Sequence, residues 1–151
     1  MSDEIIFRIP LKAVTFQSQR YGKGFVYKTE HQKNFLKAVG IILSANSRAC
    51  LNFSSKFDPK KHVLVGQWFF FYENFFTKKE KTISSAVPDI DNGKKMVQDA
   101  IFKGMGLNDK DIVHSEDIKW LGKDSIIFSL KILKRDEFQT IIENKVKNIL
   151  I

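Results

Sequence analysis

The hydrophobic pattern of the chain changes from segment to segment, and the changes separate predicted strands from predicted helices. Residues 62–72, HVLVGQWFFFY, are β-branched and aromatic, which predicts a buried strand. Further strands are predicted at 4–9, where Pro10 then ends regular pairing, and at 111–121 and 125–133. A turn at residues 122–124 is expected to join the last two strands, so they should be neighbours in the sheet.

Three other segments carry apolar residues at the spacing of an amphipathic helix. They are residues 29–45, a shorter segment from near Asn92 to the glycines at 104 and 106, and residues 135–150. The resulting order is strand, helix, strand, helix, strand, strand, helix. This order predicts one α/β or α+β domain over residues 1–151, with a mixed β-sheet flanked by helices.

The segments between these elements are more polar. Residues 17–28 contain two glycines, two tyrosines and basic residues, which indicates a mobile loop or a hairpin. Residues 46–61 are expected to form a connection, and the lysines and serines of 77–86 an exposed loop. The sequence contains no internal repeat, no low-complexity segment and no linker, so nothing in it divides the chain.

The charge of the chain points to a polyanionic partner. Lysine and arginine total 25 against 17 acidic residues, which gives a formal net charge of +8. A basic surface of this size is most often a nucleic-acid surface, although solubility alone would also explain it. Because the basic residues are spread along the chain, such a surface must be built by the folded domain.

The cellular setting follows from what the sequence lacks. A single cysteine, Cys50, excludes an internal disulfide and a multi-cysteine metal site, and it fits a reduced, cytoplasmic compartment. No apolar run approaches the ~20 residues that span a bilayer, so no membrane partner is expected.

An acidic pair beside two lysines is the first candidate for chemistry. Asp89 and Asp91 lie two residues apart in VPDIDNGKKM, so in an extended segment their carboxylates would point to the same side. Two such anions repel unless a cation lies between them, and hard oxygen ligands suit Mg²⁺. Asp91 or Asn92 could also cap the helix that follows.

The lysines after this pair allow two interpretations. If Asp91 starts the helix, Lys95 lies one turn later and faces the same way. In a structural interpretation, Lys95 neutralises the carboxylates. In a catalytic one, it meets a phosphate held by the metal, which suits phosphodiester hydrolysis. A second acidic pair, Asp109 and Asp111, follows the helix, and a hairpin-like return is expected to bring three or four carboxylates onto one rim.

The stretch 88–113, PDIDNGKKMVQDAIFKGMGLNDKDIV, resembles the RusA family of Holliday-junction resolvases. The family carries a P/R-D-x-D-N-x-x-K segment that opens a helix, an Asp-Ala pair inside that helix, and an acidic pair before a strand. The matching positions here are Asp89, Asp91, Asn92, Lys95, Asp99, Ala100 and Asp109. The resemblance covers about residues 4–133, and the helix at about 135–150 extends beyond this RusA-like core.

The resemblance implies a structure-specific endodeoxyribonuclease that depends on Mg²⁺, with Mn²⁺ as a substitute. Such enzymes are homodimers that resolve four-way DNA junctions by paired symmetrical incisions during recombination and repair, in bacteria and often in prophages. Asp89, Asp91 and Asp109 would be the metal ligands, with Asp111 as the alternative third ligand. Lys95 would be the essential lysine of the site.

The sequence also indicates which residues contact DNA, and two alternative functions remain open. A basic, aromatic loop and the lysine beside the acidic pair are expected to contact DNA: Arg20, Tyr21, Lys23, Lys28 and Lys94. One rival is a non-catalytic DNA-binding protein on the same fold. Another is a nuclease that prefers flaps or forks.

Overall fold

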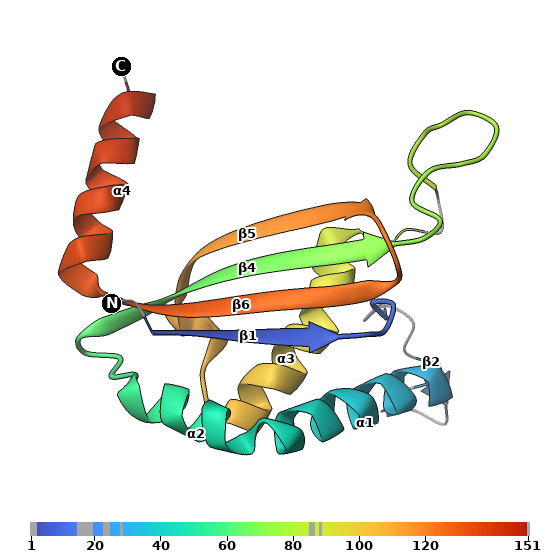
Figure 1. Cartoon of the computed structure of the whole chain (residues 1–151), viewed down its shortest axis with the longest axis horizontal. Coiled ribbons are helices and arrows are strands. Elements are labelled where there is room, and N and C mark those ends of the chain that lie inside the picture. Colours follow the sequence, from blue (N-terminus) through green and yellow to red (C-terminus); the bar gives the residue numbers. More distant parts are fainter. Residues whose placement is uncertain are drawn as a thin grey trace.

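A four-stranded sheet forms the centre of the molecule, as the computed structural model in Figure 1 shows. The structure describes residues 3–14, 20–22, 25–27, 29–84, 87 and 89–150. The sheet has the order β1-β6-β4-β5. Its strands are β1 (Asp3–Ile9), β4 (His62–Tyr72), β5 (Ile112–Leu121) and β6 (Ser125–Lys134).

The pairing within this sheet is mixed, as the sequence predicts. β6 pairs antiparallel with both β1 and β4, whereas β4 and β5 are parallel. Parallel neighbours need a crossover connection, and the helix between β4 and β5 provides it. The predicted α/β fold with a mixed sheet flanked by helices is therefore confirmed.

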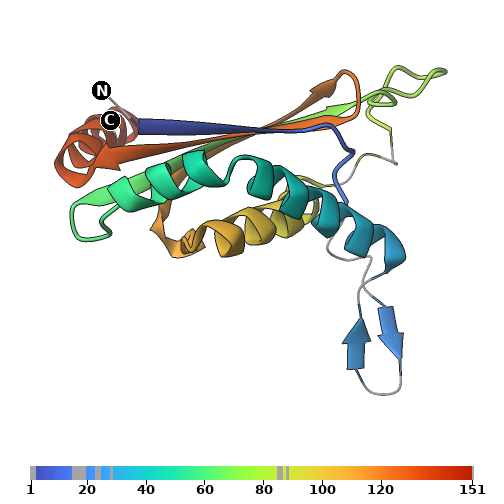
Figure 2. The ribbon, with the colours of Figure 1, turned by 60° about the horizontal axis from the view of Figure 1, so that its bottom comes forward.

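Three helices cover one face of the sheet, and Figures 1 and 2 show no helix over the other face in the described part of the chain. The covering helices are α1 (Glu30–Ala45), α2 (Ser47–Lys56) and α3 (Ile90–Met105). The last helix, α4 (Arg135–Ile149), lies across one end of the sheet and contacts β4 and β6. The domain is thus a two-layer structure with one bare sheet face.

The hydrophobic core lies between the sheet and the helix layer. Alternate residues of β4 point into it, and Trp68 and Phe70 are almost completely buried. The rings of Trp68 and Phe128 stack with centroids 3.7 Å apart. From the helix side, Val97 and Ile101 of α3 are fully buried against them. The buried side chains of the predicted strands and of the predicted helices therefore form one core.

Two connecting segments are more ordered than a simple loop. Residues 17–28 include a hairpin of β2 (Arg20–Gly22) and β3 (Phe25–Tyr27), which was one of the two forms expected there. The prediction of a connection over 46–61 was wrong, because α2 occupies most of it. Cys50 and Phe53 are the buried residues of α2, and they anchor an otherwise polar helix.

The terminal helix α4 forms where it was predicted, but none of its side chains is buried. Its apolar residues Ile141, Val146 and Ile149 stay exposed. Among the described residues, no helix combines the length and the apolar character that crossing a bilayer would demand.

Candidate active site at the start of helix α3

The first acidic pair lies at the N-terminus of α3. The helix begins at Ile90, two residues earlier than expected, and Asp89 is its N-cap residue. The side chain of Asp89 makes no capping hydrogen bond, and Asp91 lies in the first turn. The expectation of an extended segment through Asp91 was therefore wrong. The helix N-terminus instead places both carboxylates at the positive end of the helix dipole, which stabilises negative charge by about 0.3–1 kcal/mol each.

One face of α3 carries alternating charges at intervals of four residues. Asp91, Lys95, Asp99 and Lys103 are all exposed on it, and the opposite face is buried. The ammonium of Lys95 lies 3.1 Å from Oδ1 of Asp99, with both side chains about half exposed. Lys95 is thus on the same face as Asp91, one turn later, as the spacing predicts. An exposed pair of this kind contributes only about 0.3–0.5 kcal/mol, so Lys95 is held loosely.

Lys94 has a different environment from its neighbour. Its Nζ donates to Oγ of Ser115 at 2.6 Å and lies 3.0 Å from Oδ1 of Asp117. Ser115 in turn donates to Asp117 at 3.1 Å, so the three groups form a closed network. Nζ is also 5.8 Å from the centroid of the Trp68 ring. The structure therefore places Lys94, expected at the DNA, in a partly buried contact between α3 and β5.

The end of β4 supports the first turn of α3. The Tyr72 side chain is almost completely buried, and its Oη would lie 3.6 Å from a Cβ added at Gly93. Burial, and after it the negative charge of Asp124, raises the pKa of Tyr72 to about 12. Tyr72 is thus a neutral hydroxyl beneath the turn that carries Asp91.

The second acidic pair lies at the far end of the same helix. Asp109 and Asp111 form the short 3₁₀ helix η2 (Asp109–Asp111) after the C-cap Gly106. A helix of 16 residues is about 24 Å long, so it separates the two pairs within one chain. In the ranges that the structure describes, no three His, Cys, Asp or Glu side chains gather closely enough to hold a metal ion. The expected rim of three or four carboxylates does not form in a single chain.

The predicted DNA-binding loop is described in part. For Arg20 and Tyr21 the structure describes only the backbone, which forms part of β2. Lys23 and Lys28 lie outside the described residues. A second basic segment, the loop 73–84 after β4, extends away from the body of the molecule (Figure 1). Its lysines 78, 79 and 81 are exposed. The lysine-rich run is the sequence signal for this segment, and the predicted exposed loop forms there.

The partners of Lys94 were not predicted from the sequence. Ser115 and Asp117 occupy alternate positions of β5, and the strand pairing turns both towards the helix layer. Two polar residues on the inward side of a strand need polar partners, because a buried polar group without a hydrogen bond is costly. That alternation was the available signal, but the identity of the partner depended on tertiary structure.

Comparison with known proteins identifies the family of the chain. The family model for endodeoxyribonuclease RusA matches residues 10–132, which include β4, β5, most of β6, α1 to α3 and all four acidic residues, whereas β1 lies before the match. No curated protein matches the chain significantly. The matched region ends just before α4, so the terminal helix lies outside it. The chain therefore belongs to the RusA family of endodeoxyribonucleases, divalent-metal-dependent hydrolases that act on Holliday-junction DNA.

Proposed function

We propose that this protein resolves Holliday junctions by paired symmetrical incisions, using Mg²⁺ at the start of α3. The observation that supports this most directly is the pair of exposed carboxylates at the start of α3, Asp89 and Asp91, with the exposed Lys95 one turn after Asp91. The turn is fixed from below by Tyr72 and from the side by the Lys94 network. A rigid support of this kind is what a catalytic group needs for accurate placement.

The ligand chemistry of this turn suits a hard divalent ion. Mg²⁺ in nucleotide and nucleic-acid enzymes is commonly held by one or two carboxylates together with substrate phosphates and water. Asp89 and Asp91 would be those two carboxylates, and Mn²⁺, which accepts the same oxygen ligands, would substitute. Asp109, or Asp111 in its place, would be a third ligand only if a second subunit supplied it. The bound ion would supply an activated water at neutral pH.

Lys95 has a role separate from metal binding. Its ammonium is exposed on the face that carries Asp91, within reach of a phosphate bound at the helix start. Positive charge placed where the phosphate becomes more negative stabilises the transition state. The ion pair with Asp99 keeps the side chain on this face at little energetic cost.

The surroundings of the turn provide the DNA contacts in this proposal. Figures 1 and 2 agree that the β2–β3 hairpin, loop 73–84 and the start of α3 lie towards the same end of the molecule. Arg20, Tyr21, Lys23 and Lys28 would contact DNA from the hairpin region, joined by the lysines of loop 73–84. Basic and aromatic side chains suit the phosphates and splayed bases of a junction.

A homodimer is the oligomeric state that fits the reaction. A four-way junction presents two equivalent strands, and one active site cannot reach both in a single encounter. Two-fold symmetry of the protein would match that of the substrate. The protein would then work on DNA in the bacterial cytoplasm, encoded by the host or by a prophage.

The test is cleavage of a synthetic four-way junction by Asp91→Asn and Lys95→Ala. Asp91→Asn should abolish Mg²⁺-dependent cleavage yet keep junction binding, because the amide is a poor Mg²⁺ ligand and removes negative charge facing phosphate. Lys95→Ala should slow single-turnover cleavage by roughly 100-fold or more without loss of fold, as expected for lost transition-state stabilisation.

The same assay separates the rival functions. A DNA-binding protein without catalysis would bind the junction with no Mg²⁺-dependent product. A flap or fork nuclease would cut those substrates faster than the four-way junction. A Lys95→Ala protein that melts at lower temperature but cuts at the wild-type rate would remove Lys95 from the chemistry. Asp109→Asn and Asp111→Asn, tested singly, show whether either residue is required.

A further inference from the structure

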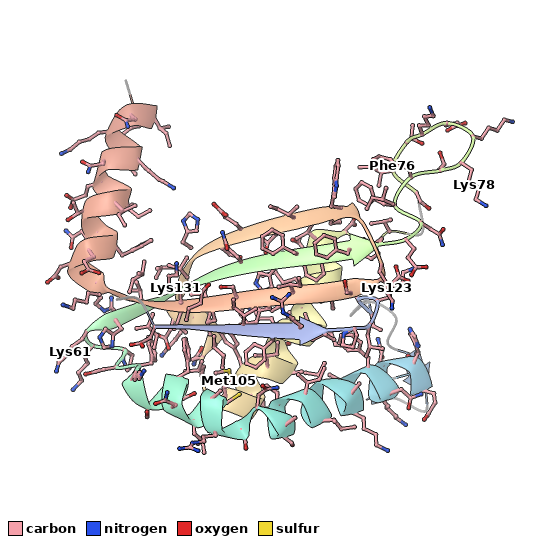
Figure 3. All side chains as sticks on the ribbon, in the orientation of Figure 1. Lys61, Phe76, Lys78, Met105, Lys123 and Lys131 are labelled. Atoms are coloured by element: carbon pink, nitrogen blue, oxygen red, sulfur yellow. The ribbon has the colours of Figure 1, made fainter. Side chains whose placement is uncertain are left out.

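Loop 73–84 is a small hydrogen-bonded hairpin rather than an irregular connection. Phe76 and Ile83 form an antiparallel bridge, and the backbone N–H of Thr77 donates to the carbonyl of Thr82 at 2.7 Å. Closer to the sheet, the N–H of Ser84 donates to the carbonyl of Phe75 at 2.8 Å. Figure 3 shows Phe76 near the end of the sheet and Lys78 further out in the loop. The backbone of the loop is therefore internally braced.

Three aromatic rings join this loop to the end of β5, and we call them the aromatic cluster: Phe75, Phe76 and Trp120. Phe75 is almost completely buried, and its ring centroid lies 4.8 Å from that of Phe76 and 5.8 Å from that of Trp120. The rings of Phe76 and Trp120 meet edge to face, with centroids 6.1 Å apart and planes at 84°. The buried Phe75 thus anchors the loop, and the other two rings lie outside it.

The two outer rings of the aromatic cluster are exposed. Trp120 is 57% exposed and Phe76 is 39% exposed. In β5, Ser115 and Asp117 turn to the helix layer, so Trp120, at an even-numbered position, points to the other side of the sheet. In the part of the chain that the structure describes, Figures 1 and 2 show no helix over that side. Because Phe75 already anchors the loop, the two exposed rings are available to a ligand.

Lysines follow the exposed rings in the same loop. Lys78, Lys79 and Lys81 are all exposed at its turn. Lys81 has a φ of 53°, a left-handed conformation that glycine adopts without strain. A lysine at such a strained position points to a use for its charge. Positive side chains beside exposed aromatic rings are typical of sites for unpaired nucleic acid, where the cations hold phosphates and the rings stack on bases.

The aromatic cluster is close to the start of α3. Phe76 follows Tyr72 by four residues, so the Cα atoms of the two residues are at most about 14 Å apart. Tyr72 lies beneath the first turn of α3, and its carbonyl accepts from the N–H of Gly122, two residues after Trp120. Successive phosphates of one strand are about 3.4 Å apart along the axis of a duplex. A base on the cluster and a phosphate at the start of α3 would therefore be separated by only several nucleotides.

We propose that Phe76 and Trp120 stack on an unpaired base at the branch point of the junction and so distinguish branched DNA from duplex. This inference rests on the proposed junction substrate and names the part of it that the protein reads. A base pair within a duplex is stacked on both sides, whereas a pair at a branch point lacks this continuous stack and opens at a lower cost. Every base has a π-face, so the contact requires no particular sequence. The lysines of the loop hold the phosphates that flank the base.

The fluorescence of Trp120 tests this contact in the full chain. The chain has two tryptophans, and the other one, Trp68, is completely buried, so quenching by acrylamide reports access to Trp120. The protein is titrated with a synthetic four-way junction and with a linear duplex of the same sequence, without divalent metal. The junction should shield Trp120 from acrylamide, and the duplex should leave it accessible. Equal shielding by the duplex, or no shielding by the junction, overturns the proposal.

Matched substitutions separate stacking from simple apolar contact. Trp120→Leu and Phe76→Leu keep an apolar side chain without a π-face, whereas Trp120→Tyr and Phe76→Tyr keep an aromatic ring. Each leucine variant should lose about 10-fold in junction affinity with its duplex affinity unchanged, and the tyrosine variants should stay close to the wild-type protein. Leu51→Ala is the control: Leu51 is 73% exposed on α2 in the helix layer, and its loss should change neither affinity. Equal junction binding by the leucine and tyrosine variants would show that the rings only hold the loop in place.

The outcomes separate the base contact from the proposed function. Cleavage of the junction by a protein whose Trp120 stays accessible overturns the base contact and leaves the nuclease standing. Shielding of Trp120 by the junction without Mg²⁺-dependent cleavage supports the base contact and favours a DNA-binding protein without catalysis. Leucine variants that lose junction and duplex affinity together overturn the proposal, because the rings would then serve DNA binding in general. If a leucine variant unfolds by circular dichroism, the shielding of Trp120 in the wild-type protein carries the test.

Discussion

At the scale of single residues, two neighbouring lysines of α3 have opposite environments. An α-helix turns by about 100° per residue, so Lys94 faces β5 when Lys95 faces solvent. The Lys94 side chain is 17% exposed, and its contact with Asp117 bridges two elements. Lys95 is 49% exposed and pairs within its own helix. The first lysine should therefore contribute to stability and the second to catalysis.

Substitution of each lysine by methionine tests this division, because both changes remove one charge and keep a long side chain. Lys94→Met should lower the free energy of unfolding by about 1–3 kcal/mol, since Asp117 and Ser115 lose their partly buried donor. Lys95→Met should change it by less than about 0.5 kcal/mol. Urea denaturation measures both values. Equal stability of the two variants would show that the Lys94 network does not hold α3 on β5.

Tyr72 gives a pH-dependent prediction. Its pKa is about 12 in the folded protein against a usual value of 10. Between these values the unfolded chain has released a proton that the folded chain keeps, so stability is fully present below pH 10 and falls as pH rises to 12. Tyr72→Phe has no proton to release there. Its melting temperature should decline less steeply over this window than that of the wild-type protein, and parallel declines would contradict the burial of the hydroxyl.

The spatial neighbours of some site residues could be predicted from the sequence, and those of others could not. Lys95 was predictable beside Asp91 because helical spacing alone relates positions four apart. The partners of Lys94 lie 21 and 23 residues further along the chain, on a strand whose register only the tertiary structure sets. Asp109 was expected beside Asp89 because the prediction assumed that the chain turns back after the helix. In the structure, the 16 residues of α3 keep the two aspartates of one chain apart.

At the scale of elements, two glycines of α3 meet different neighbours. A Cβ added at Gly93 would lie 3.5 Å from Cβ of Ala13, an ordinary contact. A Cβ added at Gly104 would come within 2.5 Å of Cδ1 of Leu43 on α1. The start of α3 thus has room for a methyl group, whereas its last turn packs closely against α1.

The matched pair Gly93→Ala and Gly104→Ala tests this packing. Alanine favours a helix over glycine by up to about 1 kcal/mol. Gly93→Ala should therefore raise the free energy of unfolding by about 0.5–1 kcal/mol. Gly104→Ala should gain less, because the side chain of Leu43 must move aside. Chemical denaturation of the two variants gives the comparison, and a larger gain at Gly104 would contradict the close approach of α1 and α3.

The elements themselves were predictable where one pattern dominates. The strand 62–72 agrees with the sequence to the residue, because a segment rich in β-branched and aromatic residues between polar flanks favours a buried strand. The helix α2 was missed because ten residues with only Cys50 and Phe53 buried show little periodicity. Helix α4 was predicted in place, but its pattern could not show that its apolar side would stay exposed in a single chain.

At the scale of the whole molecule, the candidate active site and the terminal helix α4 lie at different ends. The start of α3, the hairpin and loop 73–84 lie towards one end, and α4 lies at the other in both Figure 1 and Figure 2. Both ends carry exposed lysines, such as Lys78 and Lys79 in the loop and Lys145 and Lys147 in α4. Net charge alone does not distinguish them, but the proposed active site does.

The salt dependence of junction binding tests which end contacts DNA. Each lysine that neutralises a phosphate releases counterions and contributes about 0.9 to the slope of log affinity against log salt. The double variant Lys78→Ala/Lys79→Ala should reduce that slope by up to about two and weaken binding at low salt. Lys145→Ala/Lys147→Ala removes the same charge from the opposite end and should leave the slope unchanged. Binding is measured without divalent metal, so that cleavage does not interfere. If both double variants reduce the slope equally, the protein responds to overall charge, and the loop end has no special place at the junction.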